Sequence, residues 1–447
     1  MKKLFGTDGI RGIVNKELTP ELAMSTGKAI AKIFNNLENK SKILIGKDTR
    51  VSCDMLEGAL VSGLCFLGAD VVLLGIVPTP AVAFLTRKYG ADAGIMISAS
   101  HNPYNFNGIK IFNNEGYKIS DEIESKIEKI ILQEKEIIPT KQNLIGRVFF
   151  EPNSTRDYVD HIKRSTKLTF DGLRVAFDCS NGAAFRSAKL LFEELGCDCK
   201  MLFCEPDGMN INDHCGSVHF SSLSNFVKNN DVDLGIAFDG DADRCLAVDE
   251  NGNIVDGDSI MAICGYDMKL KNNLLKNTIV GTDMANLGLR QFCAKNDINF
   301  VSTKVGDRHV LSEMIKNGFN LGGEQSGHII FKDFSTTGDG QLTATVLLDV
   351  VKRTGEKLSK LTQKIEKIPQ VIASVEVSNR QKHRFEGDVE IISLIKEAEE
   401  KLGNDGRLLV RASGTEPLIR IMVEWKNHSE IDEFLKEFTN KIRAKIL

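Results

Sequence analysis

The stretch DLGIAFDGDADR, from Asp233 to Arg244, passes directly from an apolar run into a tight acidic turn. Such an uninterrupted run is typical of a strand buried on both faces of a sheet. Two further apolar runs end in polar loops in the same way, namely ISASHNP at 97–103 and GGEQSGH at 322–328. In open α/β sheets, ligands bind beyond the carboxyl ends of strands. These three loops are therefore the first candidates for a functional site.

Each of the three loops closes a similar unit of sequence, and the units open with the runs KILIGKDTR (42–50), RVAFDCSNGA (174–183) and TIVGTDMAN (278–286). After each opening run come a polar turn, a helix-like segment, a second apolar run and another helical segment. Strands that alternate with helices predict right-handed crossovers and mixed, mostly parallel sheets. The sequence therefore predicts three similar α/β domains, expected at 1–152, 153–254 and 255–368.

The residues after Pro369 follow a different pattern. A strand, an amphipathic helix, two strands around a turn and a closing helix are predicted in this order, at 371–377, 390–403, 406–425 and 430–446. This order indicates a smaller α+β domain at 369–447, joined by a linker near Lys364–Pro369. Its turn, RASGTEP at 411–417, is a fourth polar loop. We therefore expect four domains around one central cleft.

The composition limits the class of protein. A chain of 447 residues with 42% hydrophobic and 26% charged content is expected to form several globular domains. Its net charge of −4 provides no basic field for nucleic acid. The N-terminus lacks the apolar core of a signal peptide, and no stretch approaches the roughly 20 apolar residues of a membrane span. Ten irregularly spaced cysteines are interpreted as reduced core thiols of a cytoplasmic protein, and DHCGSVH at 213–219 lacks the second ligand cluster of a zinc site.

Three carboxylates in the acidic turn predict a metal site. Asp239, Asp241 and Asp243 are separated by single small residues, and their mutual repulsion is unfavourable unless a cation binds. Oxygen-only ligands favour Mg²⁺. An EF-hand is rejected because Arg244 stands where that loop needs glycine. A surface acidic turn stays open as an alternative, and so does a haloacid-dehalogenase-like phosphatase with Asp239 as nucleophile and Asp241 as acid/base.

Ser100 lies at the end of a predicted strand, before a turn at Asn102–Pro103, and we expect it on an exposed bend. Neighbouring residues of an extended chain point to opposite sides, so Ser100 and His101 are not expected to form a nucleophile pair. A phosphate on Ser100 would add about −1.5 to −2 charge and would need a cation nearby. The Asp triad can supply that cation, so Ser100 is a candidate phosphoryl carrier and metal ligand. Capping of the turn is the alternative role.

The two remaining loops predict substrate contacts. Glu324, Ser326 and His328 can hydrogen-bond sugar hydroxyls or an amine. The C-terminal loop carries groups that can surround a phosphate dianion: Arg411, Ser413, the backbone amides of Gly414 and Thr415, and Arg420. A surface hairpin with scattered arginines is the alternative for this loop.

Together the motifs resemble those of the α-D-phosphohexomutase family over the full length of the chain. They are GTDGIRG (6–12), SASHNP with NGIK, DGDADR, GGEQSGH with TTGDG, and RASGTEPLIR (411–420). Gln325 and the stretch NINDHCGS at 210–217 are similar to the glucosamine branch of that family. The chain departs from the family pattern at Phe106 and His309, which lie at loop edges.

The resemblance implies a fold, a reaction and a cofactor. A phosphoserine at Ser100 would phosphorylate a hexosamine phosphate, and the bisphosphate would return its other phosphate to the serine. Mg²⁺ would be the cofactor and Lys110 the partner in proton transfer. Stabilisation of the transferring group's charge is implied for Arg11, His101 and Arg244.

For the glucosamine branch, the implied substrates are glucosamine 6-phosphate and glucosamine 1-phosphate, which lead to UDP-N-acetylglucosamine and cell-wall precursors. Mutases of glucose or mannose phosphates are the alternative, and a non-catalytic sugar-phosphate-binding protein is a further one. A monomer or a homodimer is expected.

Overall fold

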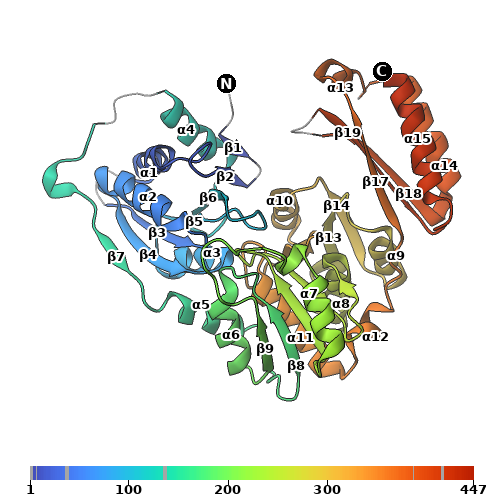
Figure 1. Ribbon diagram of the computed structural model, residues 1–447, viewed down its shortest axis with the longest axis horizontal. Helices are drawn as coiled ribbons and strands as arrows, with labels where there is room; N and C mark the ends of the chain where they lie inside the picture. The colour runs from blue at the N-terminus through green and yellow to red at the C-terminus, as the bar shows by residue number, and fades with distance from the viewer. Residues whose placement is uncertain are drawn as a thin grey trace.

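The computed structural model describes residues 4–446 except for Thr7, residues 36–39, residues 134–137, Glu386 and residues 414–416. The strands form sheets of seven, five, four and three strands. Figure 1 shows the first domain on the left and the C-terminal domain at the upper right, with the second and third domains between and below them. Three α/β domains and an antiparallel C-terminal domain are thus confirmed.

The first domain has strand order β1-β2-β6-β5-β3-β4-β7. Its strands are β1 Phe5–Gly6, β2 Gly9–Ile13, β3 Lys42–Lys47, β4 Asp70–Ile76, β5 Ala93–Ile97, β6 Phe106–Asn113 and β7 Val148–Phe150. Its helices are α1 Pro20–Phe34, α2 Cys53–Phe66, α3 Thr79–Lys88 and α4 Asp121–Leu132. Strands β5, β3, β4 and β7 run parallel, whereas β6, β2 and β1 are joined by antiparallel pairs.

The second and third domains repeat the parallel part of this plan. The second comprises α5 Ser154–Lys163, β8 Arg174–Asp178, α6 Ala184–Glu194, β9 Asp198–Leu202, α7 Ser221–Asn229, β10 Leu234–Phe238, β11 Cys245–Val248 and β12 Ile254–Val255. The third comprises α8 Gly257–Leu270, β13 Thr278–Thr282, α9 Leu287–Lys295, β14 Asn299–Thr303, α10 Asp307–Asn317, β15 Leu321–Gly323, β16 Ile329–Phe331, α11 Gly340–Thr354 and α12 Leu358–Thr362. Their strand orders are β12-β11-β10-β8-β9 and β14-β13-β15-β16.

The three predicted loops all lie within antiparallel hairpins. In each domain the third repeated strand (β5, β10 or β15) ends in the polar loop, and the chain then returns as β6, β11 or β16. The returning strands were not among the predicted elements. Since strands hold both ends of each loop, the loops are anchored where their polar side chains must be placed accurately.

The C-terminal domain comprises β17 Gln370–Glu376, α13 Asn379–Phe385, α14 Val389–Leu402, β18 Gly406–Ala412, β19 Leu418–Trp425 and α15 Ile431–Ile446. Its two long helices and its strands were predicted, and α13 was not. Helix α14 is followed by Gly403, whose φ of 56° is favourable for glycine. The linker before β17 is held by Ile368, which is 1% exposed and donates its N–H to Asn286 Oδ1 at 3.1 Å.

The hydrophobic cores show which domains act as one body. A continuous cluster of buried side chains joins the first three domains, with members such as Val82, Phe177 and Leu347. The C-terminal domain has a separate core between one sheet face and its helices, with members such as Ile421 and Phe438. The site built by the first three domains therefore has a rigid frame.

Two further observations concern the sequence-based expectations. All ten cysteines are free and none is exposed, as expected for core thiols. Among the described residues, no helix has both the length and the apolar character needed to span a bilayer.

Candidate active site

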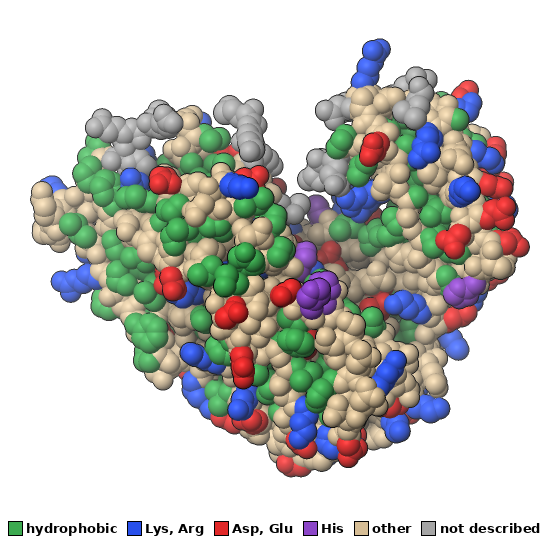
Figure 2. All heavy atoms as spheres, viewed as in Figure 1, with side chains coloured by type: hydrophobic (Ala, Val, Ile, Leu, Met, Phe, Trp, Pro, Cys, Tyr) green, Lys and Arg blue, Asp and Glu red, His purple; other side chains and the backbone are tan. Residues whose placement is uncertain are grey.

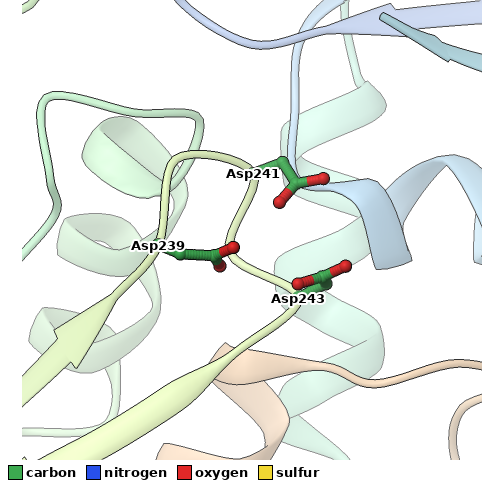
Figure 3. Close-up of side chains that lie close together, drawn as sticks. All are labelled: Asp239, Asp241 and Asp243. Carbon is green, nitrogen blue, oxygen red and sulfur yellow. The ribbon is translucent and has the colours of Figure 1, made fainter. Parts of the chain in front are cut away.

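Asp239, Asp241 and Asp243 form the turn between β10 and β11. Ala242 adopts a φ of 54°, which tightens the turn, and each carboxylate offers an oxygen within 4.8 Å of the other two. Figure 3 shows the three carboxyl groups gathered around one point. All three residues are buried, so the alternative of an exposed acidic turn is wrong.

The electrostatics of this triad fit a divalent cation. Burial and the charges of Asp243 and Asp241 raise the pKa of Asp239 well above its usual value. Among the described residues, Asp241 Oδ1 and Asp243 Oδ1 are buried without a hydrogen-bond partner. Buried carboxylate oxygens are rarely left unsatisfied, and hard oxygen ligands are what Mg²⁺ or a similar cation binds. The triad is therefore a candidate metal site.

Ser100 lies against this triad from the first domain. Its Oγ donates to Asp239 Oδ2 at 2.6 Å, across 139 residues of sequence. Ser100 is only 1% exposed, so the expectation that it lies on an exposed bend is wrong. The acidic turn and Asn212, both from the second domain, cover the loop that carries Ser100. Asn212 Nδ2 donates a hydrogen bond to Ser100 O at 2.9 Å.

In an extended chain the side chain of His101 would point away from Ser100, but in the structure it does not. Its Nδ1 lies 3.3 Å from Ser100 Oγ. The reason is a φ of 54° at Ser100, which turns both side chains to one side. Burial, together with the charges of Arg244 and Arg11, lowers the pKa of His101 to about 4, so its imidazole is neutral near pH 7.

The predicted cations surround the same point. Lys110 Nζ, which is buried, lies 2.8 Å from Asp241 Oδ2 and 3.3 Å from Asp243 Oδ2. Burial lowers the pKa of Lys110, but Asp241, Asp8 and Asp243 raise it by more, so the amine is protonated in this arrangement. The Arg244 Nε lies 3.9 Å from Asp243 Oδ1.

The third domain contributes the loop between β15 and β16. His328 is 4% exposed, accepts the N–H of Gly338 at Nε2 (3.0 Å) and places Nδ1 3.6 Å from Asp243 Oδ2. Glu324 is partly exposed, and its Oε1 accepts the N–H of Gly306 at 3.1 Å. Ser326 is exposed. The loop thus contacts the triad through His328 and offers Glu324 and Ser326 towards solvent.

The C-terminal domain presents Arg411 and Arg420 on the sheet face that its helices leave uncovered. The two residues are cross-strand partners in β18 and β19, with Ser374 of β17 beside Arg420. They line a pocket with Met284 of the third domain. Ser413 is buried, and the predicted Gly414 and Thr415 lie outside the described residues. In Figure 2 the molecule is hollowed between the first and C-terminal domains.

Models of the four phosphoglucomutase/phosphomannomutase domains, three α/β/α domains and a C-terminal domain, match residues 2–137, 156–252, 256–368 and 356–441. The chain belongs to this family. It is a phosphohexomutase, an intramolecular phosphotransferase of the isomerase class.

Curated relatives of this phosphohexomutase share its whole length. The phosphoglucosamine mutase of Acetivibrio thermocellus is 52% identical over 449 residues, which is 100% of both chains. That of Clostridium novyi is 49% identical over 100% of this chain and 99% of the relative.

Solved structures share the fold. A phosphoglucomutase/phosphomannomutase family protein from Burkholderia thailandensis has a TM-score of 0.81 at 25% identity, covering 99% of this chain and 97% of the other. The N-acetylphosphoglucosamine mutase of Aspergillus fumigatus, in complex with GlcNAc-6P and magnesium, has a TM-score of 0.68 at 17% identity and covers 99% and 95%.

Some residues around the phosphohexomutase site had no role in the sequence-based prediction. Asp8 forms ion pairs with Arg11, Lys110 and Lys118. Lys118 also contacts Asp307 and so joins the first domain to the third. Asp8 stands within the quoted motif GTDGIRG, which is the signal that could have revealed it. Lys118 belongs to no motif and emerges only from the fold.

Proposed function

We propose that this phosphohexomutase interconverts glucosamine 6-phosphate and glucosamine 1-phosphate. Full-length identity of 49–52% to phosphoglucosamine mutases supports this substrate pair. The observation that carries the chemistry is the Ser100 hydroxyl, held 2.6 Å from Asp239 at the edge of a buried carboxylate triad. The product would lead to UDP-N-acetylglucosamine.

The proposed cofactor is Mg²⁺, held by Asp239, Asp241, Asp243 and an oxygen on Ser100. When bound, it would supply positive charge to the oxygens of the transferring phosphoryl group. The magnesium in the complex of the Aspergillus fumigatus mutase supports this choice of ion.

In the proposed reaction, the bond between phosphorus and Ser100 Oγ breaks as a sugar hydroxyl forms a new bond to phosphorus. The hydroxyl loses a proton and the serine oxygen gains one. Lys110, which is protonated in the structure, is the proposed partner: it gives a proton to the serine oxygen and regains one from the sugar hydroxyl. Arg11 and Arg244 are proposed to stabilise the charge of the transferring group, because both cations lie close enough to His101, beside Ser100 Oγ, to lower its pKa. Neutral His101, beside Ser100 Oγ, can hydrogen-bond that group.

The sugar then presents its other phosphate to the serine, so one site performs both half-reactions. Glu324, Ser326 and His328 are the proposed contacts of the third-domain loop with the sugar, where His328 also orients Asp243. The proposed phosphate clamp comprises Arg411, Ser413, Gly414, Thr415 and Arg420.

A direct test of the substrate preference compares turnover of glucosamine 6-phosphate with that of glucose 6-phosphate in the presence of a trace of bisphosphate primer. Faster turnover of the glucose substrate would contradict the proposed preference.

Glu324→Gln should reduce kcat/KM for glucosamine 6-phosphate more than for glucose 6-phosphate. A carboxylate can pair with the protonated 2-amine, and a charge-assisted hydrogen bond contributes about 1.5–3 kcal/mol. We therefore expect a selective loss of about tenfold or more. Steady-state kinetics on both substrates measure this effect, and Gln325→Glu, one residue along, serves as a charge control. Equal losses on both substrates would show that Glu324 does not recognise the amine.

Arg420→Ala should raise KM and lower kcat together, because the phosphate that is not transferred orients the sugar. The C-terminal domain has its own core and can move as a body over the cleft, which would exclude water from the phosphoserine. Binding of Mg²⁺ and phosphorylation of Ser100 should stay unchanged in the variant. Arg443→Ala, on the exposed face of α15, is the matched control. Unchanged kinetics in Arg420→Ala would remove this residue from the clamp.

A further inference from the structure

Arg50, in the turn after β3, is one of the largest fully buried side chains of the molecule. Burial of a guanidinium is costly unless its five N–H groups all find acceptors. In this structure they do, at Asp48 Oδ2 and at the carbonyl oxygens of Ser100, Asn102, Pro103 and Phe106. Four of the five acceptors are therefore main-chain carbonyls, three of them in the loop that carries Ser100 and one at the start of β6.

The same network holds Ser100 from its other side. The N–H of Ser100 donates to Ser98 Oγ at 2.9 Å, and Ser98 Oγ donates to Asp48 Oδ2 at 2.7 Å. This Asp48 oxygen also accepts from Arg50 Nε at 2.9 Å. Both the amide and the carbonyl of Ser100 are thus tied to one buried ion pair between Arg50 and Asp48.

The backbone conformation of Ser100 explains why such a network is needed. Its φ of 54° lies in the left-handed region, which is unfavourable for a residue with a Cβ atom. Such conformations persist only where the surrounding structure over-determines them. At Ser100 this conformation places Oγ 2.6 Å from Asp239 Oδ2.

We propose that Arg50, held by Asp48, is a positioning residue for phosphoryl transfer. It keeps Ser100 in the left-handed conformation that aims the hydroxyl at the Asp triad. The inference rests on the proposed function in one respect, namely that Ser100 carries the phosphoryl group. Arg50 itself is enclosed and acts through the loop, without touching the substrate.

Arg50→Lys tests this role. Lysine keeps the charge beside Asp48, but its ammonium has three donors at one point and cannot hold four carbonyls in different directions. A displaced nucleophile reacts slowly, so kcat should fall by about 10²-fold, with KM for glucosamine 6-phosphate changed by less than about threefold. Arg50→Met also leaves the buried carboxylate of Asp48 without its charge partner, so it should lose at least as much activity as Arg50→Lys. Arg443→Lys, on an exposed helix face, is the control and should match the wild type.

Two further measurements complete the test. Hydrogen exchange of the peptide 98–106 should be faster in Arg50→Lys, and this result does not depend on the reaction. Ser98→Ala removes one hydroxyl and leaves the Arg50 pair intact, so it should fold even if Arg50→Lys does not. We expect it to lower kcat by about tenfold, the cost of one hydrogen bond, with little change in KM and a modest decrease in Tm, since the buried N–H of Ser100 loses its acceptor.

Several outcomes would overturn the proposal. They are near-normal kcat in Arg50→Lys, unchanged exchange in its loop, or full activity in Ser98→Ala. A wild-type protein without mutase activity would instead refute the proposed function, and the exchange experiment would still decide whether Arg50 holds the loop.

Discussion

Ser100→Ala is expected to abolish mutase activity, with a loss of at least about 10³-fold, because the variant lacks the hydroxyl that is proposed to carry the phosphoryl group between half-reactions. The hydroxyl lies at hydrogen-bond distance from the buried Asp triad, where a phosphoserine would meet the metal ion. The variant should remain folded, since alanine retains the Cβ atom and removes one oxygen. Activity assays, Tm and peptide mass analysis together measure these expectations.

Ser180→Ala is the matched control. Ser180 is also buried, follows the first strand of the second domain and has a φ of 50°, but its Oγ donates to the Cys179 carbonyl. Both substitutions therefore place alanine in a buried left-handed position, and only the variant at Ser100 should be inactive. Phosphate found on Asp239, or an active Ser100→Ala enzyme, would favour the dehalogenase-like phosphatase instead.

Removal of the metal is expected to have the second large effect. Chelation should abolish turnover, and added Mg²⁺ should restore it, because three buried carboxylates otherwise repel one another and any phosphate. In Asp241→Asn, binding of Mg²⁺ should weaken sharply, since this residue supplies an oxygen that has no hydrogen-bond partner among the described residues. Calorimetric titration with Mg²⁺ alone measures this effect without reference to activity.

Thermal stability offers an independent measurement of the same site. Mg²⁺ should raise the Tm of the wild type by mass action and should raise that of Asp241→Asn much less. Asp178→Asn is the control, because Asp178 ends β8 in the same sheet, outside the triad. Both oxygens of Asp178 accept backbone N–H groups, from Ser180 and Gly216, so the control should start from a lower Tm but show the same rise with Mg²⁺ as the wild type. Full activity of the chelated wild-type enzyme would contradict a metal requirement.

Much of the fold could be predicted because its signals are local. Apolar runs such as 234–238 form strands, and the spacing of Asp239, Asp241 and Asp243 brings their carboxylates together within a single turn. The returning strands β6, β11 and β16 were missed as elements; β6 has eight residues, whereas β11 and β16 have only four and three. Short apolar runs acquire their structure from pairing with a neighbour, which is a tertiary contact.

The repeated α/β units, the loops at their strand ends and the local grouping of the carboxylates follow from short-range patterns in the sequence. The conformation of Ser100 and the protonation of its neighbours depend instead on contacts between distant parts of the chain. A positive φ at serine depends on Arg50, 50 residues away, and on Asn212, 112 residues away. Likewise, the pKa of Lys110 is raised by Asp241 and Asp8, which come from two different domains. Burial and Coulomb energies depend on distances in space, and those distances exist only once the domains have packed together.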